Sequence, residues 1–178
     1  MTVGELLQRT RAGGVAHAEL TAARGGAGTV RFTGTCDFDR GVTTLERDAD
    51  GPRTLWVRLT GDEIGLTAGG EPEQRLVGDA WAGHDVGRSG AGLLALLDQV
   101  ADTPLDDAGG ALPAPAPEAW IRAVAVHVTG IPLPHGRRAA GVTVRADADG
   151  RLAEIAVTER RVLGAPRVTH ALRLTDWR

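Results

Sequence analysis

The stretch "TVRFTGTCDFDRGVTTLERD", residues 29–48, decides the fold that the sequence predicts. In its first half apolar and small residues alternate with polar ones, which is the period of a β-strand. The turn "DRG" (39–41) separates this run from a second strand-like run, "VTTLERD" (42–48). Two strands joined by so short a connection pair antiparallel, as a hairpin. The apolar face of the first strand holds Val30, Phe32, Gly34, Cys36 and Phe38.

The same strand pattern recurs on both sides of this hairpin. Further strands are predicted at 15–23, 53–59, 63–69, 74–81, 120–130, 139–150, 151–161 and 166–177. Short Gly/Asp turns between the first of them indicate an antiparallel meander. One apolar face per strand indicates a sheet that is covered on one side only.

Two helices are predicted, one at the start of the chain and one in its middle. The first has Val3, Leu6, Leu7 and Thr10 on one face and ends at Gly13-Gly14. The second covers 89–102, where Ser89 is a plausible N-cap and leucines recur at helical spacing. The Pro/Ala/Gly-rich segment 102–119 that follows is expected to be a loop, either a linker or a lid.

These elements predict an α+β fold, with residues 1–178 as a single domain. About nine or ten antiparallel strands form a strongly curved sheet, a half-barrel, and two helices cover its concave face. Folds of this kind often leave a cavity between sheet and helix, where ligands bind.

Composition and charge exclude several classes of function. The 20 basic and 23 acidic residues give a net charge of −3, which argues against a nucleic-acid partner. All basic residues are arginines, and the chain has no Lys, no Asn and no Tyr. No metal-binding spacing is present among the five histidines, so neither a metal nor another cofactor is expected.

The location of the protein is left open by the sequence. Its first residues, "MTVGELLQRTRAGG", contain no apolar core of a signal peptide, and no stretch approaches the length of a membrane span. Read as it stands, the chain is cytoplasmic, and it belongs to the cell envelope if an export signal was omitted. Trp56, opposite Leu55, Val57 and Leu59 in its strand, is expected on the convex side or at an edge. There it would either cover the sheet or make peripheral membrane contact.

Cys36 and two histidines are the residues with the most chemical potential. Cys36 lies on the apolar face between Phe32 and Phe38, beside acidic neighbours, which indicates a buried structural thiol rather than a nucleophile. His127 and His170 occupy alternating strand positions, where they are either ordinary hydrogen-bonded residues, a polar anchor for a ligand, or an acid/base pair.

Several diffuse motifs are informative through the order in which they follow one another along the chain. They are the helix "ELLQRTRA" (5–12), the strand with Gly34, Asp37 and Phe38, "LLALL" (93–97), "VHVTGIPLPHG" (126–136), "VTVRADADGRLAEIAV" (142–157) and "RVTHALRLTDW" (167–177). In this order the chain resembles the LppX/LprG-type lipoproteins of actinobacteria, which share the half-barrel fold of the LolA lipoprotein carrier. It departs from them in lacking a signal peptide and a lipid-acceptor cysteine near its start.

The resemblance implies a non-enzymatic protein that binds or carries a lipid or other long hydrophobic molecule in an apolar cavity. The residues predicted as lining or core are Val30, Phe32, Phe38, Leu55, Val57, Leu59, Leu93, Leu97, Val144, Leu172 and Leu174. One alternative is a cytoplasmic biosynthetic enzyme, such as a cyclase, that shapes a hydrophobic intermediate, with His127 and His170 as acid/base candidates. Another is a protein-interaction module that uses a sheet edge or the 103–118 loop.

Overall fold

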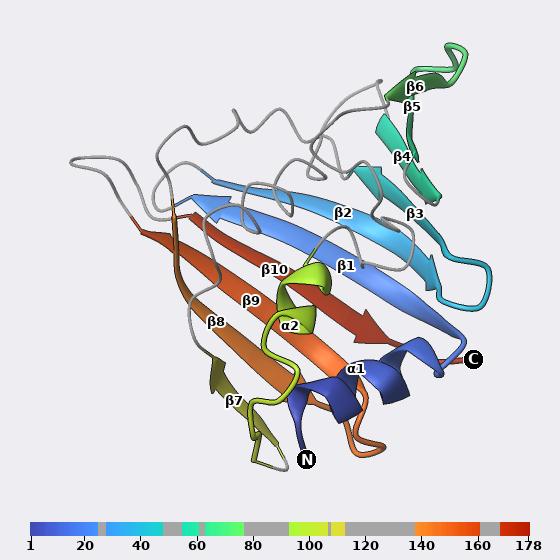
Figure 1. Ribbon diagram of the computed structural model, residues 1–178. Coiled ribbons are helices and arrows are strands. Elements are labelled where there is room, and N and C mark those ends of the chain that lie inside the picture. The colour runs from blue at the N-terminus through green and yellow to red at the C-terminus, as the bar shows by residue number, and fades with distance from the viewer. Residues whose placement is uncertain are drawn as a thin grey trace.

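One curved antiparallel sheet dominates the computed structural model, which describes residues 1–24, 28–47, 55–60, 63–76, 93–106, 108–112, 138–160 and 168–178. Within these ranges the sheet has ten strands in the order β6-β5-β4-β3-β2-β1-β10-β9-β8-β7. The strands are β1 (Val15–Arg24), β2 (Gly28–Asp37), β3 (Val42–Arg47), β4 (Leu55–Thr60), β5 (Glu63–Ala68), β6 (Gln74–Leu76), β7 (Gly109–Leu112), β8 (Arg138–Ala146), β9 (Leu152–Arg160) and β10 (Val168–Thr175). The sheet does not close into a barrel (Figure 1).

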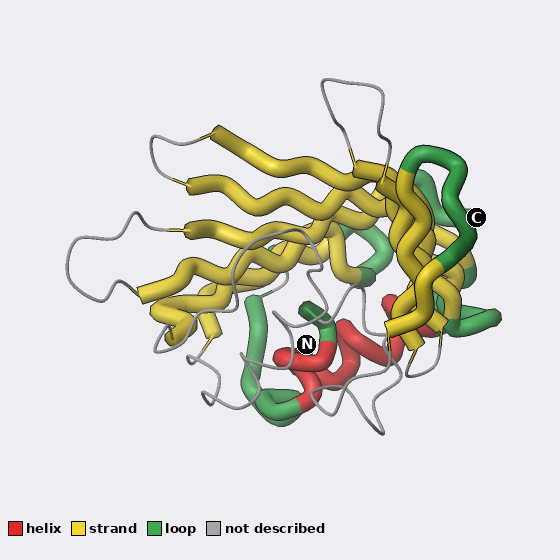
Figure 2. Tube along the Cα trace, turned by 90° about the horizontal axis from the view of Figure 1, so that it is seen from above, coloured by secondary structure: helices red, strands yellow, loops and turns green. Residues whose placement is uncertain are grey.

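Two short helices lie on the concave side of this sheet. They are α1 (Val3–Arg11) and α2 (Ala95–Asp98). Seen from above, the strands arch over both helices (Figure 2). The predicted α+β fold, with a curved antiparallel sheet covered by helices on its concave face, is confirmed. Among the described residues no helix is long and apolar enough to cross a membrane.

The first and the last strand of the sheet are neighbours. β1 pairs antiparallel with β10, from Arg24 opposite Val168 to His17 opposite Thr175. The backbones of Val15 and Arg178 exchange two further hydrogen bonds, of 3.0 and 2.8 Å. The sheet therefore consists of two runs of hairpins joined along this one seam, a pairing that the sequence patterns did not predict.

Side chains on the concave face form rows that cross the sheet. One row, taken from the pairing register, consists of Val144, Ile155, Leu172, Leu20 and Phe32, on β8, β9, β10, β1 and β2. None of these side chains is more than 6% exposed. The hydrophobic core thus lies on the concave side and continues across the seam between the two halves.

A glycine lets two neighbouring strands approach closely. Gly34 of β2 pairs with Leu45 of β3, and a Cβ atom at this position would overlap the backbone oxygen of Thr44. A clash with backbone cannot be relieved by moving a flexible side chain. Glycine inside a strand is typical of such close approaches, so the spacing of β2 and β3 at this point depends on Gly34.

Helix α1 is well defined at its start and buries its apolar face. Thr2 and Glu5 form a capping box: the Thr2 hydroxyl accepts from the Glu5 N–H at 3.2 Å, and the Glu5 carboxylate accepts from the Thr2 N–H at 2.8 Å. The buried residues of the helix are the predicted ones: Val3, Leu6, Leu7 and Thr10. Gly14, just beyond the helix, has a φ of 80°, which suits glycine.

A buried hydroxyl fastens α1 to the sheet. Thr10 Oγ1 donates a hydrogen bond to the carbonyl of Leu6 at 2.7 Å and accepts one from the N–H of Leu152 at 2.8 Å. Thr10 and Leu152 are both fully buried. Because water cannot replace either partner there, this link sets how the helix sits on β9.

The middle of the chain differs from the predictions in two places. The predicted helix over 89–102 is present only as α2, since residues 93–103 make successive i→i+3 backbone hydrogen bonds that form tight turns around it. Ser89 lies outside the described residues, and the N-cap of α2 is Leu94, without a side-chain hydrogen bond.

The segment 102–119 was wrongly predicted to be a loop throughout. Residues 109–112 form the strand β7, which pairs with β8 from Gly109 opposite Arg145 to Leu112 opposite Val142. Backbone hydrogen bonds to β8 make this strand, not its own side chains. The predicted strand at 120–130 lies outside the described residues, as do Trp81 and Trp120; Trp56 is 44% exposed and lies on the face opposite the core.

The convex face carries a row of alternating charges. Arg145, Glu154, Arg173, Glu19 and Arg31 come from β8, β9, β10, β1 and β2 in turn. The distances between successive charged groups are 3.3, 2.9, 4.0 and 2.6 Å. The pKa of Glu154 is lowered; partial burial raises it, but the hydrogen bonds and charges of Arg173 and Arg145 outweigh that effect. The two faces of the sheet are thus clearly different, one apolar and one charged.

We expect the substitution Gly34→Ala to lower the free energy of unfolding by at least about 2 kcal/mol, because the added Cβ overlaps the backbone of β3. Denaturation in urea measures this loss. Gly141→Ala in β8 is the control, since a Cβ there meets no atom within 4 Å. Equal losses in the two variants would contradict the role of Gly34 in the close approach of β2 and β3.

We expect Thr10→Val, which keeps the shape of the side chain, to cost about 1–3 kcal/mol, because the buried N–H of Leu152 loses its acceptor. Amide exchange at Leu152 should accelerate while exchange in the middle of β1 stays slow. Thr60→Val, at an exposed site on β4, serves as the control. Unchanged exchange at Leu152 would show that the hydroxyl does not hold the helix.

Candidate functional site

The apolar core between the concave face and the helices is the candidate binding site. The buried members of the predicted set are Phe32, Phe38, Val57, Leu59, Leu93, Leu97, Val144, Leu172 and Leu174. Val30 and Leu55 are partly buried and pack against the same core. The structure thus brings all of these residues together in one core, although they come from both halves of the sheet and from the α2 segment. Their contact with a ligand stays a prediction.

Arg47, at the end of β3, lies on the concave face although it is charged. It alternates with Thr43 and Leu45, which are at most 2% exposed, and its partner across the strands is the buried Phe32. Arg47 thereby extends the apolar row that contains Leu20 and Phe32 by one strand. Its Nε atom is buried and has no hydrogen-bond partner.

The sequence analysis did not single out Arg47. The signal was present in "VTTLERD", where strand alternation places Arg47 on the same face as Leu45. The identity of that face becomes clear only from the register with Phe32.

His170 is part of the apolar wall. It is fully buried on β10, where it lies between Ala22 of β1 and Val157 of β9. Its position on the core face agrees with the strand alternation. His127, the other member of the proposed acid/base pair, lies outside the described residues, so the pair stays a prediction.

Cys36 is a buried structural residue. Its side chain is fully buried, and it accepts a hydrogen bond from the Thr43 hydroxyl at 3.4 Å. Burial raises the pKa of the Cys36 thiol from 9.0 to about 11, and the hydrogen bond from Thr43 lowers it only in part. A thiol in this state supplies almost no thiolate at neutral pH. The prediction that Cys36 belongs to the apolar face is confirmed.

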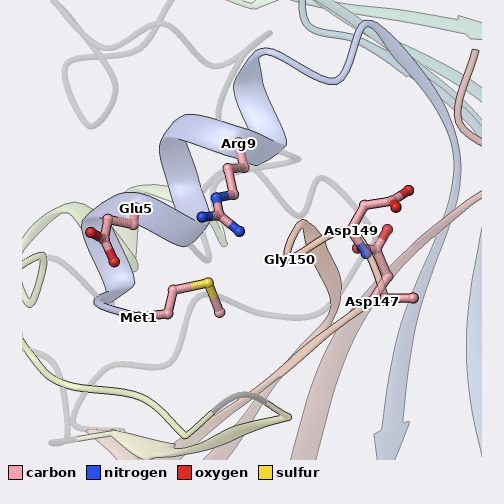
Figure 3. Close-up of a pocket in the computed structure, with 7 residues that line it drawn as sticks. Met1, Glu5, Arg9, Asp147, Asp149 and Gly150 are labelled. Atoms are coloured by element: carbon pink, nitrogen blue, oxygen red, sulfur yellow. The ribbon is translucent and has the colours of Figure 1, made fainter.

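An open polar groove of about 450 Å³ lies outside the core, between α1 and the β8–β9 turn. Its walls are formed by Met1, Glu5, Arg9, Asp147, Ala148, Asp149 and Gly150. Figure 3 shows Glu5 and Arg9 on the helix at one side of the groove and Asp147 and Asp149 on the turn at the other side. The carboxylates serve local structure: Glu5 caps α1, and Asp147 accepts from the backbone N–H groups of Asp149 and Arg151 at 2.9 and 2.8 Å.

The corner next to this groove is held by a tryptophan. Trp177 stacks on Phe38 with ring centroids 5.8 Å apart, and the guanidinium of Arg151 lies 4.9 Å from the centre of the Trp177 ring. Arg151 also pairs with Asp147 and Asp149. These contacts stabilise the corner. In the described part of the chain no group of three or more His, Cys, Asp or Glu side chains could hold a metal ion.

Comparison with known proteins identifies the fold of this chain. No family model and no curated protein matches the sequence. Among solved structures, the lipoprotein LppX of Mycobacterium tuberculosis superposes with a TM-score of 0.50 over 98% of this chain and 94% of LppX, at 12% sequence identity. The chain has the fold of LppX. This likeness confirms the predicted resemblance as one of structure; at such low identity it does not extend to family membership.

Above pH 9 we expect the stability of the protein to fall because of Cys36. The folded state keeps its thiol proton up to about pH 11, whereas the unfolded chain loses it near pH 9, so the unfolded state gains stability between these values. The full loss in the free energy of unfolding is about 3 kcal/mol. The chain has no Lys and no Tyr that would titrate in the same window.

Denaturation at a series of pH values from 8 to 11.5 measures this loss. The variant Cys36→Ala should be less stable at neutral pH but should lose about 3 kcal/mol less than the wild type across the series. Parallel pH profiles for the two proteins would rule out a buried neutral thiol.

Proposed function

We propose that this protein binds and carries a lipid or another long hydrophobic molecule between the concave face of its sheet and its helices. The observation that carries the proposal is the curved, unclosed sheet whose concave face is apolar across both halves. In the described part of the chain only the short helices α1 and α2 lie on that face. The fold is shared with LppX, which is a lipoprotein.

A strongly curved sheet must have its concave side filled. A flat sheet packs against a helix layer without space between them, but a strongly bent sheet has a hollow that its own side chains must fill. Several concave-face positions of β1 carry small residues: Ala16, Ala18 and Ala22. A ligand that completes this filling gains roughly 25 cal/mol for each Å² of apolar surface removed from water.

The first test is direct detection of a bound molecule. We expect organic extracts of the purified protein to contain an amphiphile at a stoichiometry near one, detected by mass spectrometry. The delipidated protein should then bind the uncharged fluorescent probe N-phenyl-1-naphthylamine, with enhanced emission. A protein that yields no extractable ligand and takes up no probe would contradict the carrier function.

A pair of substitutions on neighbouring residues of β1 separates a hollow from a solid core. Ala22 is buried on the concave face, and Ala23 lies on the opposite face. We expect Ala22→Trp to fold with a melting temperature near that of the wild type but to abolish probe uptake, because the indole occupies ligand space. Ala23→Trp should bind probe normally. Severe destabilisation by Ala22→Trp alone would indicate a core already filled by side chains.

A further inference from the structure

Arg47 differs in both place and pairing from three arginines of the sheet whose side chains the structure describes. Arg31, Arg58 and Arg145 lie on the convex face, and each has a carboxylate oxygen within 3.3 Å. Arg47 lies on the concave face, next to Phe32. Among the described residues it forms neither an ion pair nor a side-chain hydrogen bond, although its Nε atom is buried.

This placement has a physical cost that the rest of the described chain does not offset. Arginine stays charged at every pH that a folded protein tolerates, so Arg47 cannot escape the cost by losing its proton. A buried donor without an acceptor is destabilising, and most such groups in folded proteins have a partner. Within the described part of the chain no acceptor fills this role, so an acceptor that reaches the end of the apolar row on the concave face would remove the cost.

We propose that Arg47 binds the anionic headgroup, a carboxylate or a phosphate, of the hydrophobic ligand; this inference rests on the proposed carrier function. The planar guanidinium presents parallel N–H donors that match two oxygens of such a group. Phe32 and Leu20, next in the row from Arg47, provide apolar surface for the adjoining hydrocarbon. The ligand is therefore an anionic amphiphile and not a neutral oil.

The charge of the whole protein would not by itself produce a preference for anions. With a net charge of −3, the protein does not attract an anion through its overall field. A preference for anionic over neutral ligands must then come from a local cation. Glu46, the neighbour of Arg47, lies on the opposite face beside Trp56, so it does not neutralise the site from the concave side.

The experiment measures headgroup preference with one chain length. Dodecanoate, dodecyl phosphate and dodecanol each displace N-phenyl-1-naphthylamine from the full-length wild-type protein and from Arg47→Gln, Arg47→Lys and Arg58→Gln. Arg58, on the convex face of the adjacent strand, provides the matched control for the loss of one positive charge. Thermal melting of each variant reports whether it is folded.

We expect the wild type to bind at least one of the two anions about 10-fold or more tightly than dodecanol, the ratio typical of a charged hydrogen bond. Arg47→Gln should reduce this ratio to about 1 while its affinity for dodecanol stays unchanged, and Arg47→Lys should keep part of the preference. Arg58→Gln should behave as the wild type does. The ratio of dodecanoate to dodecyl phosphate affinity identifies the headgroup.

Two results would overturn the inference while leaving the carrier function in place. One is equal affinity of the wild type for anions and alcohol. The other is a preference that survives in Arg47→Gln. Failure of the wild type to bind the probe or any of the three amphiphiles would instead remove the carrier function, and the role of Arg47 with it.

Discussion

The pairing of β1 with β10 is the constraint on which the rest of the structure depends. Each of the other strand pairs in the described sheet joins strands that are consecutive in the described order, and most of them are separated by short connections. Only the β1–β10 seam brings the two halves together and places Leu20 beside Leu172. The seam merges two apolar faces into one concave surface, and α1 covers part of it. The hydrogen bond from Leu152 of β9 to the hydroxyl of Thr10 holds the helix there. Without the seam, each half would expose its apolar face to water.

The parts of the fold that follow from local patterns could be predicted from the sequence. Alternation in residues 29–38 defines a strand face, and short Gly/Asp turns define hairpins, because both depend on residues close in the chain. The strand β7 escaped prediction because Gly109, Gly110 and Ala111 carry no strand-like side chains and pair only through their backbone. The pairing of β1 with β10 was not predicted for a related reason, since nothing in the local sequence of either strand identifies the other as its partner.

The candidate site likewise contains residues that local patterns predict and one that they do not. The apolar wall and the buried thiol of Cys36 were predictable, because burial of an alternating apolar face is a property of each strand alone. Arg47 was not, since a charged residue at the end of a strand normally turns to solvent. Its place beside Phe32 depends on the register between β2 and β3, which the hairpin turn determines and composition does not show. Arg47, the proposed headgroup-binding residue, is thus one that local sequence patterns do not identify.

The seam also has a consequence for the order in which the chain is made. Arg24 and Val168 pair at the seam, and at about 5–20 residues per second a ribosome needs on the order of ten seconds to make the chain between them. During this time β1 is the open edge of an unfinished sheet, which is a template for pairing with other chains. The core face of β1 consists of Ala16, Ala18, Leu20 and Ala22, so this strand offers little apolar surface while it waits. The small side chains on the core face of β1 thus limit the apolar surface that this edge presents before β10 is made.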